Sequence, residues 1–388
     1  MGKIRFIERA PRELQYKLGP DDPKLEAHDV ESIAQIFRTP LTGSYTWSYE
    51  EADRRIRKLY RLGKERNWNA ETDIDWSKPV DHTKSPMNDG LDNPFAGWDV
   101  YDRMSEAEEI QFGWHQQSWL LSQFLHGEQG ALLVASQLVS CAPTYDAKLY
   151  AASQTFDEAR HVEVFNKYIM DRIGFMYPIN ASLKLLLDKV LTDERWDLKF
   201  IGMQLVIESL ALAAFNTQKM ISADPVMSEV LELVTRDESR HVAFGVTYME
   251  EFVKSLSNEE REDRAQFAYE ACCIMRERIV GTDVIAHYGW DVEEGRRRLL
   301  AGGMMEEFRN LLFTRIIPNL KKVGLLTERV RPLYEALGVL KYENLVDDGQ
   351  IDWAKLEEAL PEYAATADPA VTQSGIRELS PRARSRAV

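Results

Sequence analysis

The sequence is poor in cysteine and in basic residues. Its 388 residues include only three cysteines, Cys141, Cys272 and Cys273. They are too few for a disulfide framework or for an iron–sulfur cluster of the chain's own, and they favour a reducing cytoplasm. Lysine and arginine number 48 against 63 aspartates and glutamates, so the net charge is −15. Because a phosphate backbone attracts basic proteins, this charge argues against a nucleic-acid partner.

The sequence also has no long uninterrupted apolar segment. The most apolar stretches, 131–142 and 206–215, contain Ser, Gln or Glu and are shorter than the about 20 residues that span a bilayer. The N-terminal segment has no apolar run of signal-peptide length, and Phe6 stands where a myristoylation motif has Ser or Thr. We therefore expect a cytoplasmic protein without a membrane partner.

Most of the sequence has the apolar spacing and the capping residues of helices, and no region has a pattern typical of several β-strands. We therefore expect an all-α fold. Residues 1–104 form an irregular arm with one helix, which follows a capping box at Ser48 and Glu51. A core of long helices covers 105–255, further helices cover 256–362, and a flexible tail covers 363–388. The long helices are expected at about 105–140, 146–173, 194–221, 225–254 and 257–280, with shorter pieces near 181–190, 292–322, 328–337 and 352–360.

Two pentapeptides carry the clearest chemical signal. DEARH at 157–161 and DESRH at 237–241 differ only at the middle residue and lie 80 residues apart. On a helix, a Glu and a His three residues apart share one face and can bind one metal ion. A single Glu-x-x-His would be expected about once by chance, but two copies in matching frames indicate a duplicated metal-binding motif.

A four-helix dimetal site needs one more carboxylate from each of the other two helices, at the same height. Glu128 and Glu158 each lie 15 residues from Pro143, where the first pair of helices would turn. Glu208 and Glu238 each lie 15 residues from the centre of the next turn. Both lone glutamates have apolar neighbours, where an uncompensated carboxylate is costly. The predicted metal ligands, which are also the catalytic residues, are Glu128, Glu158, His161, Glu208, Glu238 and His241.

The donor set indicates which metals fit. Four carboxylates and two imidazoles suit iron or manganese better than a metal that seeks thiolates. Asp157 and Asp237 could reach across to the far nitrogen of the opposite histidine, and Arg160 and Arg240 could neutralise them. The alternative for these four residues is ordinary ion pairing on helix surfaces.

The repeated E-x29-E-x2-H pattern resembles the ferritin-like di-iron carboxylate oxygenases and oxidases. Within that superfamily, GEQGALLVASQLVSCAP followed by QTFDEARH is most similar to hydroxylase α-subunits of bacterial multicomponent monooxygenases. The resemblance implies a ferritin-like four-helix bundle core with extra helices, and a cofactor of two Fe ions with Mn as the alternative metal. Glu128, Glu158 and His161 would bind one iron and their counterparts 80 residues later the other, with shared carboxylates bridging.

Three positions depart from patterns within the superfamily. Phe165 stands where ribonucleotide reductase small subunits carry a radical tyrosine, which disfavours that assignment. Val234 stands where p-aminobenzoate N-oxygenases add a third histidine, one turn before the last glutamate, which argues against an N-oxygenase of that subtype but leaves nitrogen oxidation open. Leu212 stands where the monooxygenase hydroxylases often have a threonine, one turn after the third carboxylate.

Apolar residues one helical turn from the lone glutamates predict a substrate pocket, although the same pattern is typical of plain bundle core. These residues are Phe124, Ala131, Leu132, Ala211, Leu212 and Phe215.

Together these features predict a non-haem di-iron, O2-activating oxygenase, a hydroxylase or monooxygenase, that acts on a small organic substrate. The resemblance implies a separate reductase or ferredoxin as electron donor and a homodimer. An amine N-oxygenase on the same scaffold is one alternative. A ferritin-like metal store or redox-inactive bundle is another, and it is weakened by the long arm and the extra helices.

Overall fold

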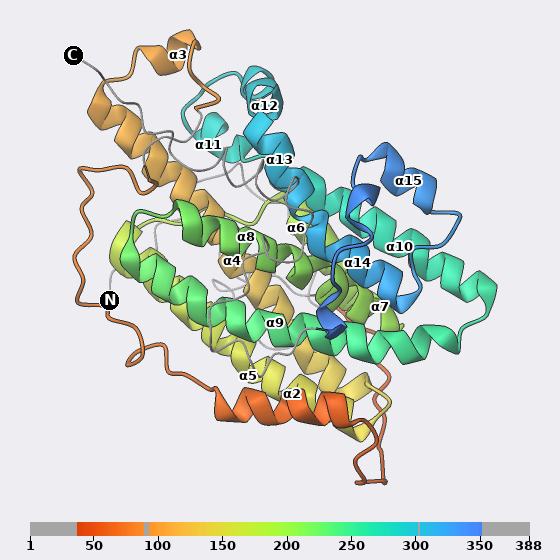
Figure 1. The fold of residues 1–388 in the computed structure, drawn as a ribbon. Coiled ribbons are helices and arrows are strands. Elements are labelled where there is room, and N and C mark those ends of the chain that lie inside the picture. Colours follow the sequence, from red (N-terminus) through yellow and green to blue (C-terminus); the bar gives the residue numbers. More distant parts are fainter. Residues whose placement is uncertain (1–36, 89–92, 302, 351–388) are drawn as a thin grey trace, which may run out of the picture.

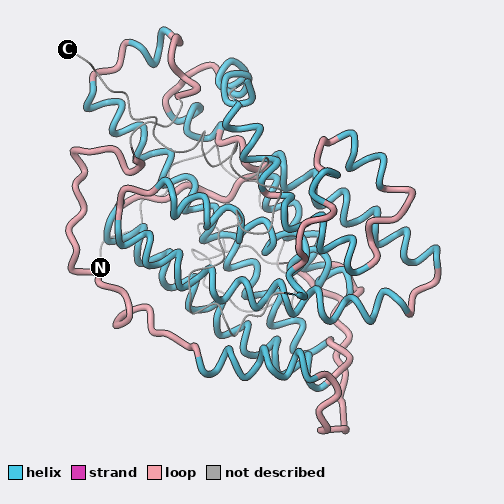
Figure 2. Tube along the Cα trace, viewed as in Figure 1, coloured by secondary structure: helices cyan, strands magenta, loops and turns pink. Residues whose placement is uncertain are grey.

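The computed structural model describes residues 37–88, 93–301 and 303–350 (Figure 1). Within these residues the chain is built from helices and loops, and it has no β-strand beyond one isolated bridge between Met87 and Ser222 (Figure 2). The expected all-α fold is therefore confirmed. The helix expected near 352–360, the tail at 363–388 and the first 36 residues of the arm lie outside the described residues.

Two helical hairpins form the centre of the molecule. Helix α4 (Glu106–Cys141) packs along α5 (Tyr145–Tyr168), and α8 (Glu208–Ile221) packs along α9 (Pro225–Lys254), as the tan, yellow and green ribbons show (Figure 1). The expected capping box at Ser105 begins α4, and the Asp224 side chain caps α9 ahead of its first-turn proline. These caps fix where the hairpins start, and so the height at which their glutamates meet.

The third long helix is not regular, contrary to the sequence prediction. It consists of α7 (Trp196–Phe200), a π-helix η2 (Ile201–Ile207) and α8. A β-carbon on Gly245 of α9 would lie 2.4 Å from Cβ of Gln204, so the glycine allows η2 to approach α9 closely. A second π-helix, η1 (Ile169–Ile173), extends α5 to Gly174, which has a φ of 87°. Wide turns of this kind often occur at functional sites.

The helix of the N-terminal arm, α2 (Arg54–Glu65), begins later than the sequence predicted. Its N-cap is Asp53, whose side chain accepts from the backbone N–H groups of Arg55 and Ile56. The predicted cap at Ser48 is wrong. The helix starts five residues later because the backbone N–H of Asp53 donates to the side chain of Asp146 in α5 at 2.9 Å, which fixes the start of α2 at that position. The apolar face of α2 packs against α5 and α9 and covers that side of the bundle (Figure 1).

The remaining helices surround the two hairpins. Helix α10 (Asn258–Glu277) begins at the expected capping box of Ser257 and packs against α6 (Ala181–Thr192) and η2, while α14 (Phe313–Val323) packs against α8 and α9. Their bounds are α3 Asp99–Asp102, α6 Ala181–Thr192, α10 Asn258–Glu277, α11 Thr282–His287, α12 Val292–Ala301, α13 Gly303–Leu311, α14 Phe313–Val323 and α15 Arg331–Ala336, with short 3-10 turns η3 Leu340–Tyr342 and η4 Asp348–Gln350.

One stretch, Trp196–Ile221, is long and apolar enough to cross a membrane by length and composition alone. Its most apolar part is 94% buried inside the protein. A helix that is apolar on every side and enclosed by other helices is typical of a protein core.

Candidate metal centre

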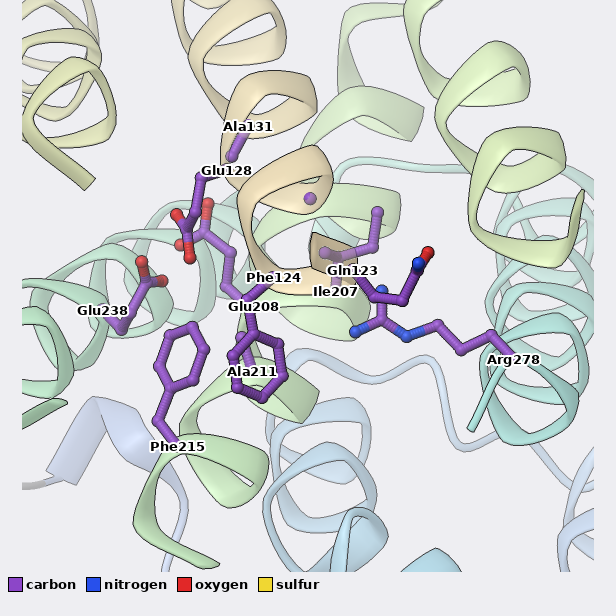
Figure 3. A pocket seen from close by; sticks show the side chains of 11 residues that line it. Gln123, Phe124, Glu128, Ala131, Ile207, Glu208, Ala211, Phe215, Glu238 and Arg278 are labelled. Atoms are coloured by element: carbon purple, nitrogen blue, oxygen red, sulfur yellow. The ribbon is translucent and has the colours of Figure 1, made fainter. Parts of the chain in front are cut away.

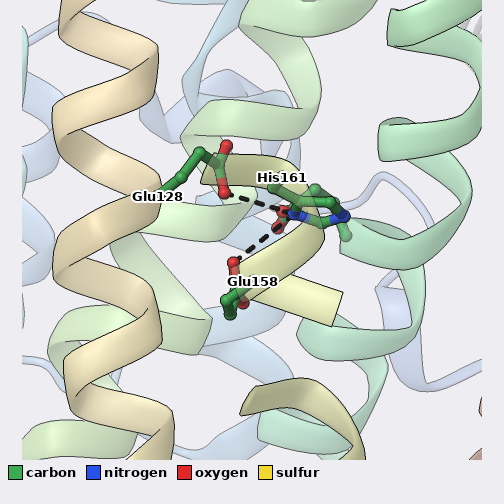
Figure 4. A group of neighbouring side chains, drawn as sticks. Glu128, Glu158 and His161 are labelled. Atoms are coloured by element: carbon green, nitrogen blue, oxygen red, sulfur yellow. Dashed lines mark hydrogen bonds and ion pairs between the residues drawn. The ribbon is translucent and has the colours of Figure 1, made fainter. Parts of the chain in front are cut away.

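The four central helices bring the six predicted ligands together, and Figure 4 shows three of them, Glu128, Glu158 and His161. Helix α4 supplies one glutamate, α5 a glutamate and a histidine, α8 a glutamate at its first residue, and α9 a glutamate and a histidine. None of the six is more than 5% exposed. Residues that are distant in sequence therefore share one buried cluster.

The first half of the cluster surrounds the Nδ1 atom of His161. Oε2 of Glu128 lies 3.2 Å from this nitrogen, and Oε2 of Glu158 lies 3.4 Å from it (Figure 4). Oε1 of Glu238 lies 3.1 Å from the same atom. One donor atom from each of these four residues falls within 4.8 Å of all the others, which is the spacing of a set that can hold one metal ion.

The second half repeats this arrangement around Nδ1 of His241. Oε1 of Glu158 lies 3.1 Å and Oε2 of Glu208 lies 3.3 Å from that nitrogen. Oε2 of Glu238 completes the group at 3.5 Å. Glu158 and Glu238 thus present one oxygen to each half, which is the geometry of carboxylates shared between two metal ions.

Several polar atoms of the cluster have no hydrogen bond although they are buried. These atoms are Oε2 of Glu158, Oε2 of Glu208, Oε2 of Glu238 and Nδ1 of His241. Buried polar atoms are almost always satisfied in folded proteins, because an unpaired one costs free energy. Metal coordination would satisfy all of them, so the donor set fits two divalent cations.

The pKa values of the cluster point the same way. Burial, followed by the negative charge of Glu238, raises the pKa of Glu128 and of Glu208 well above its ordinary value. Burial also disfavours charge on His161, yet hydrogen bonds to Asp237 and to the neighbouring glutamates raise the pKa of its imidazole. Glu128 and Glu208 therefore resist ionisation on their own, and a divalent cation beside each carboxylate would favour its ionised form.

Two aspartates contact the outer nitrogens of the histidines. Oδ2 of Asp237 lies 3.2 Å from Nε2 of His161, and Oδ2 of Asp157 lies 3.3 Å from Nε2 of His241. Each aspartate therefore reaches the histidine of the opposite motif, as the sequence analysis expected. Arg160 and Arg240 ion-pair with both aspartates, and all four side chains are buried. The alternative of surface ion pairing is wrong for these residues.

The sequence analysis missed three residues of this network. Nε1 of Trp68, which follows α2, donates to Oδ2 of Asp237 at 2.7 Å. Nε2 of Gln154 donates to one oxygen of Glu158 at 3.1 Å and to one of Glu208 at 2.8 Å. Gln204 in η2 donates to Gln154 at 3.3 Å. Gln154 lies one helical turn before Glu158, so helical spacing could have found it; Trp68 and Gln204 carry no motif.

A small cavity adjoins the cluster (Figure 3). Its volume of about 20 Å³ is enough for one or two water molecules. Four predicted pocket residues line it, but Leu132 and Leu212 do not, because they lie off the helix faces that meet there. The lining residues are Gln123, Phe124, Gly127, Glu128, Ala131, Ile207, Glu208, Ala211, Phe215, Glu238 and Arg278.

Comparison with protein families identifies the group to which this bundle belongs. The family described as p-aminobenzoate N-oxygenase AurF matches residues 49–324, which include all six cluster residues. The chain belongs to the AurF family. The protein is therefore a ferritin-like di-iron oxidoreductase of the oxygenase class, and the predicted superfamily is confirmed. The matching family is that of an N-oxygenase, whereas the sequence analysis placed the hydroxylase α-subunits first and argued from Val234 against the p-aminobenzoate N-oxygenases. The chain belongs to that family although position 234 is not a histidine.

Solved structures with a similar fold include R2-like ligand-binding oxidases. A mutant with an anaerobically reconstituted Mn/Fe cofactor has a TM-score of 0.47 and 16% identity, over 72% of this chain and 95% of that chain. The oxidase with an aerobically reconstituted metal cofactor after photoconversion has a TM-score of 0.47 and 16% identity, over 71% of this chain and 95% of that chain. No curated protein matches the chain in sequence.

Proposed function

We propose that the six cluster residues hold two iron ions and that the protein oxidises the amine nitrogen of a small organic substrate. The observation that carries the metal assignment is the buried cluster itself, in which one group of four and one group of three carboxylate and imidazole donors could each hold a metal ion and several of these atoms have no hydrogen bond. Glu158 and Glu238 would be the carboxylates shared by the two ions, because each presents one oxygen to either half of the cluster. The iron supplies O2 activation, and the protein supplies the ligand geometry and a buried, water-poor site.

Membership in the AurF family supports nitrogen as the oxidised atom. In the first oxidation of a primary amine, one oxygen atom of O2 forms an N–O bond and the other leaves as water, which consumes two electrons and two protons. The chain departs from the family pattern at Val234, which is fully buried on α9. The proposed site therefore has two histidine ligands, and carbon hydroxylation is the competing outcome of the test.

The electrons for this reaction come, in our proposal, from a separate reductase or ferredoxin. The three cysteines are too few to ligate an iron–sulfur cluster within the chain, and Cys141 and Cys272 are buried. We also propose a cytoplasmic location and a homodimer. Light scattering of the purified protein tests the dimer, since a monomer mass would contradict it.

The test of the function is product analysis. Iron-loaded protein is given a chemical reductant, isotopically labelled O2 and a panel of aryl amines, and the products are identified by mass spectrometry. We expect labelled hydroxylamine, nitroso or nitro products. Glu158→Ala should abolish them, while Glu163→Ala, at an exposed position on the same helix, should not. Labelled phenols alone would place the protein among hydroxylases, and products from Glu158→Ala would contradict the assigned site.

A further inference from the structure

The surface helix α2 is strongly basic, whereas the chain as a whole is acidic. Six of the twelve residues of α2 are arginine or lysine and one is glutamate, although the net charge of the chain is −15. Five of the six basic residues are exposed, and they lie outside the apolar face that packs against the bundle. We call these five residues the basic face of α2; they are Arg54, Arg55, Lys58, Arg61 and Lys64.

The protein itself neutralises little of this charge. Arg55 forms an ion pair with Glu250 of α9 at 3.3 Å. Within the described part of the chain, the side chains of Arg54, Arg61 and Lys64 form no ion pair. Exposed charges of one sign create a potential that attracts a surface of the opposite sign. The basic face is therefore suited to an acidic partner.

A second arginine-rich helix, α12, shows the opposite arrangement. Its three consecutive arginines all pair with acidic side chains: Arg296 with Glu277, and Arg297 and Arg298 with Glu294. Helices α12 and α2 lie at opposite ends of the molecule (Figure 1). The charges of α12 are compensated within the protein, so this helix is a natural control for the basic face.

The C-terminal end of α2 leads to the metal cluster. Trp68, three residues after the helix, donates to Oδ2 of Asp237 at 2.7 Å, and the same oxygen lies 3.2 Å from Nε2 of His161. Asn67 accepts a hydrogen bond from Arg160, whose guanidinium lies 4.6 Å from the centre of the Trp68 ring. Two contacts therefore join the segment that follows α2 to a residue of the cluster.

An exposed phenylalanine lies beside this end of α2. Phe156 of α5 is 60% exposed, and the centre of its ring lies 5.6 Å from the guanidinium of Arg160. One turn earlier on α5, the hydroxyl of Ser153 lies 3.6 Å from the position of a β-carbon on Gly63 of α2. An apolar centre with a polar rim is typical of protein interfaces. A twelve-residue helix is about 18 Å long, which suits the small interfaces of electron-transfer complexes.

The proposed reaction needs electrons from a donor that cannot reach the metal ions. The six cluster residues are at most 5% exposed, and the adjoining cavity admits only about 20 Å³. Electrons must therefore cross the protein from a surface at which the donor binds. A donor with an iron–sulfur cluster ligated by thiolates brings negative charge to that surface. The basic face of α2 is where such charge would be attracted.

We propose that the basic face of α2, together with Phe156, docks a small acidic one-electron carrier protein of the ferredoxin class. In each encounter the iron–sulfur cluster of the carrier is oxidised by one electron and one ferric ion of the metal cluster is reduced to ferrous, so two encounters reduce the pair. The inference rests on the proposed function, because it requires a metal pair that accepts electrons. Docking and reduction can both be measured without an amine substrate.

The dependence of the reduction rate on salt distinguishes this docking face from the overall charge. Two acidic proteins repel each other, so salt that screens the repulsion raises the rate of their association. A carrier attracted to the basic face behaves in the opposite way, because salt screens the local attraction and lowers the rate. The net charge of −15 thus predicts one sign of the salt effect, and the basic face predicts the other.

The experiment mixes iron-loaded, oxidised protein with a reduced plant-type [2Fe–2S] ferredoxin in an anaerobic stopped-flow instrument, without amine or O2. The second-order rate constant of the wild type should fall at least about tenfold between about 20 mM and about 300 mM salt. The Arg54→Glu/Arg61→Glu variant should be at least about tenfold slower at low salt, and its rate should rise with salt. Its iron content and helix content should not change, because both side chains are exposed.

The matched control is the Arg296→Glu/Arg297→Glu variant of α12, which changes the net charge by the same amount. Its rate at low salt should stay within about twofold of the wild type. Calorimetric titration with oxidised ferredoxin measures docking apart from electron transfer, and the three proteins should show the same order of affinity. Arg61→Gln, which removes one charge without reversing it, should give an intermediate rate and serves if the double variant does not fold.

Four results would overturn the inference. They are a wild type that the ferredoxin does not reduce, a wild-type rate that rises with salt, an α2 variant as fast as the wild type, and an α12 variant as slow as the α2 variant. If the ferredoxin kinetics are unchanged in the α2 variant but light scattering shows that it has lost a subunit, the basic face binds a second copy of the chain instead.

The two proposals fail in different ways. Ferredoxin docking and metal reduction that depend on α2, without any N-oxidised product, would refute the proposed function and leave the docking face standing. N-oxidised products obtained with a chemical reductant, together with ferredoxin kinetics that do not depend on α2, would do the reverse.

Discussion

His161 and Asp237 come from opposite helical hairpins, and their Nε2 and Oδ2 atoms lie 3.2 Å apart. His241 and Asp157 repeat the contact in the other direction at 3.3 Å. Each histidine is thereby oriented by the motif that supplies the other half of the cluster. The outer contact fixes which ring nitrogen faces the carboxylates, and it links the geometry of the two halves.

Asp237→Asn is expected to weaken metal binding by about 10–100-fold, because the histidine loses the partner that orients its ring. Competition with a chelator measures the affinity, and circular dichroism checks that the helices persist. Asp171→Asn, at an exposed position in η1, is the matched control and should bind metal as the wild type does. Equal metal affinity in the two variants would show that the contact does not act on the site.

Trp68→Phe should destabilise the protein more than Trp76→Phe. Both indoles donate at 2.7 Å, but Trp68 donates to the buried carboxylate of Asp237 and Trp76 to the backbone carbonyl of Ala70. A hydrogen bond to a charged group contributes about 1.5–3 kcal/mol, against about 0.5–1.5 kcal/mol for a neutral one. Urea unfolding of the two variants measures the difference, and the reverse order would refute the role given to Trp68.

Gly245→Ala is expected to cost about 1–3 kcal/mol and to weaken metal binding, because the new methyl group would lie 2.4 Å from Cβ of Gln204. Displacing Gln204 disturbs Gln154, which holds two of the cluster carboxylates. Gly113→Ala is the control, since its new Cβ meets only Pro86 at ordinary contact distance and alanine favours the helix. A Gly245→Ala protein as stable as the control would contradict the close approach of η2 to α9.

A pH dependence is expected from His115, which lies away from the cluster. Burial, and then the charge of His287, lowers the pKa of His115 to about 4. Its Nδ1 bonds the hydroxyl of Tyr177 at 2.9 Å, and Tyr288 packs against its ring. The imidazole of His115 is protonated more readily in the unfolded chain than in the folded protein. The contribution of His115 to stability is therefore complete above about pH 6.5 and is lost as the pH falls toward 4.

Thermal unfolding between pH 6.5 and 4.5 tests this expectation. The stability of the wild type should fall more steeply than that of His115→Gln, by a slope equivalent to at most about one proton. The pKa of His287 is also lowered by burial, so a residual dependence in the variant is expected. Parallel curves for the two proteins would contradict the buried, neutral state of His115.

The residues of the cluster could be predicted to come together because their positions depend on local rules. A Glu and a His three residues apart share a helix face whatever the tertiary structure, and equal distances of Glu128 and Glu158 from Pro143 place them level in any antiparallel hairpin. The prediction of the cluster needed only the helix period and the positions of the turns. The contacts of Asp157 and Asp237 were inferred from their place beside the motif glutamates, because metal-binding histidines usually donate their other nitrogen to a carboxylate.

The missed features depend on packing between elements that no local pattern links. The π-helix η2 depends on Gly245 of a different helix, and Trp68 reaches Asp237 from a segment that the sequence shows only as irregular. Arg278 carries no motif and enters the cavity because the end of α10 is held against α6. The predicted start of α2 was wrong for a similar reason, since the position of its first residue depends on a contact with Asp146 of α5.

The central claim is that one buried cluster holds two metal ions, and the metal content of the chain tests it most directly. The protein is reconstituted anaerobically with Fe(II), freed of unbound metal and analysed for iron per chain. We predict about two irons in the wild type and a loss of at least about one in His241→Ala, with helix content unchanged. Substoichiometric iron in the wild type, or about two irons retained by His241→Ala, would contradict the account.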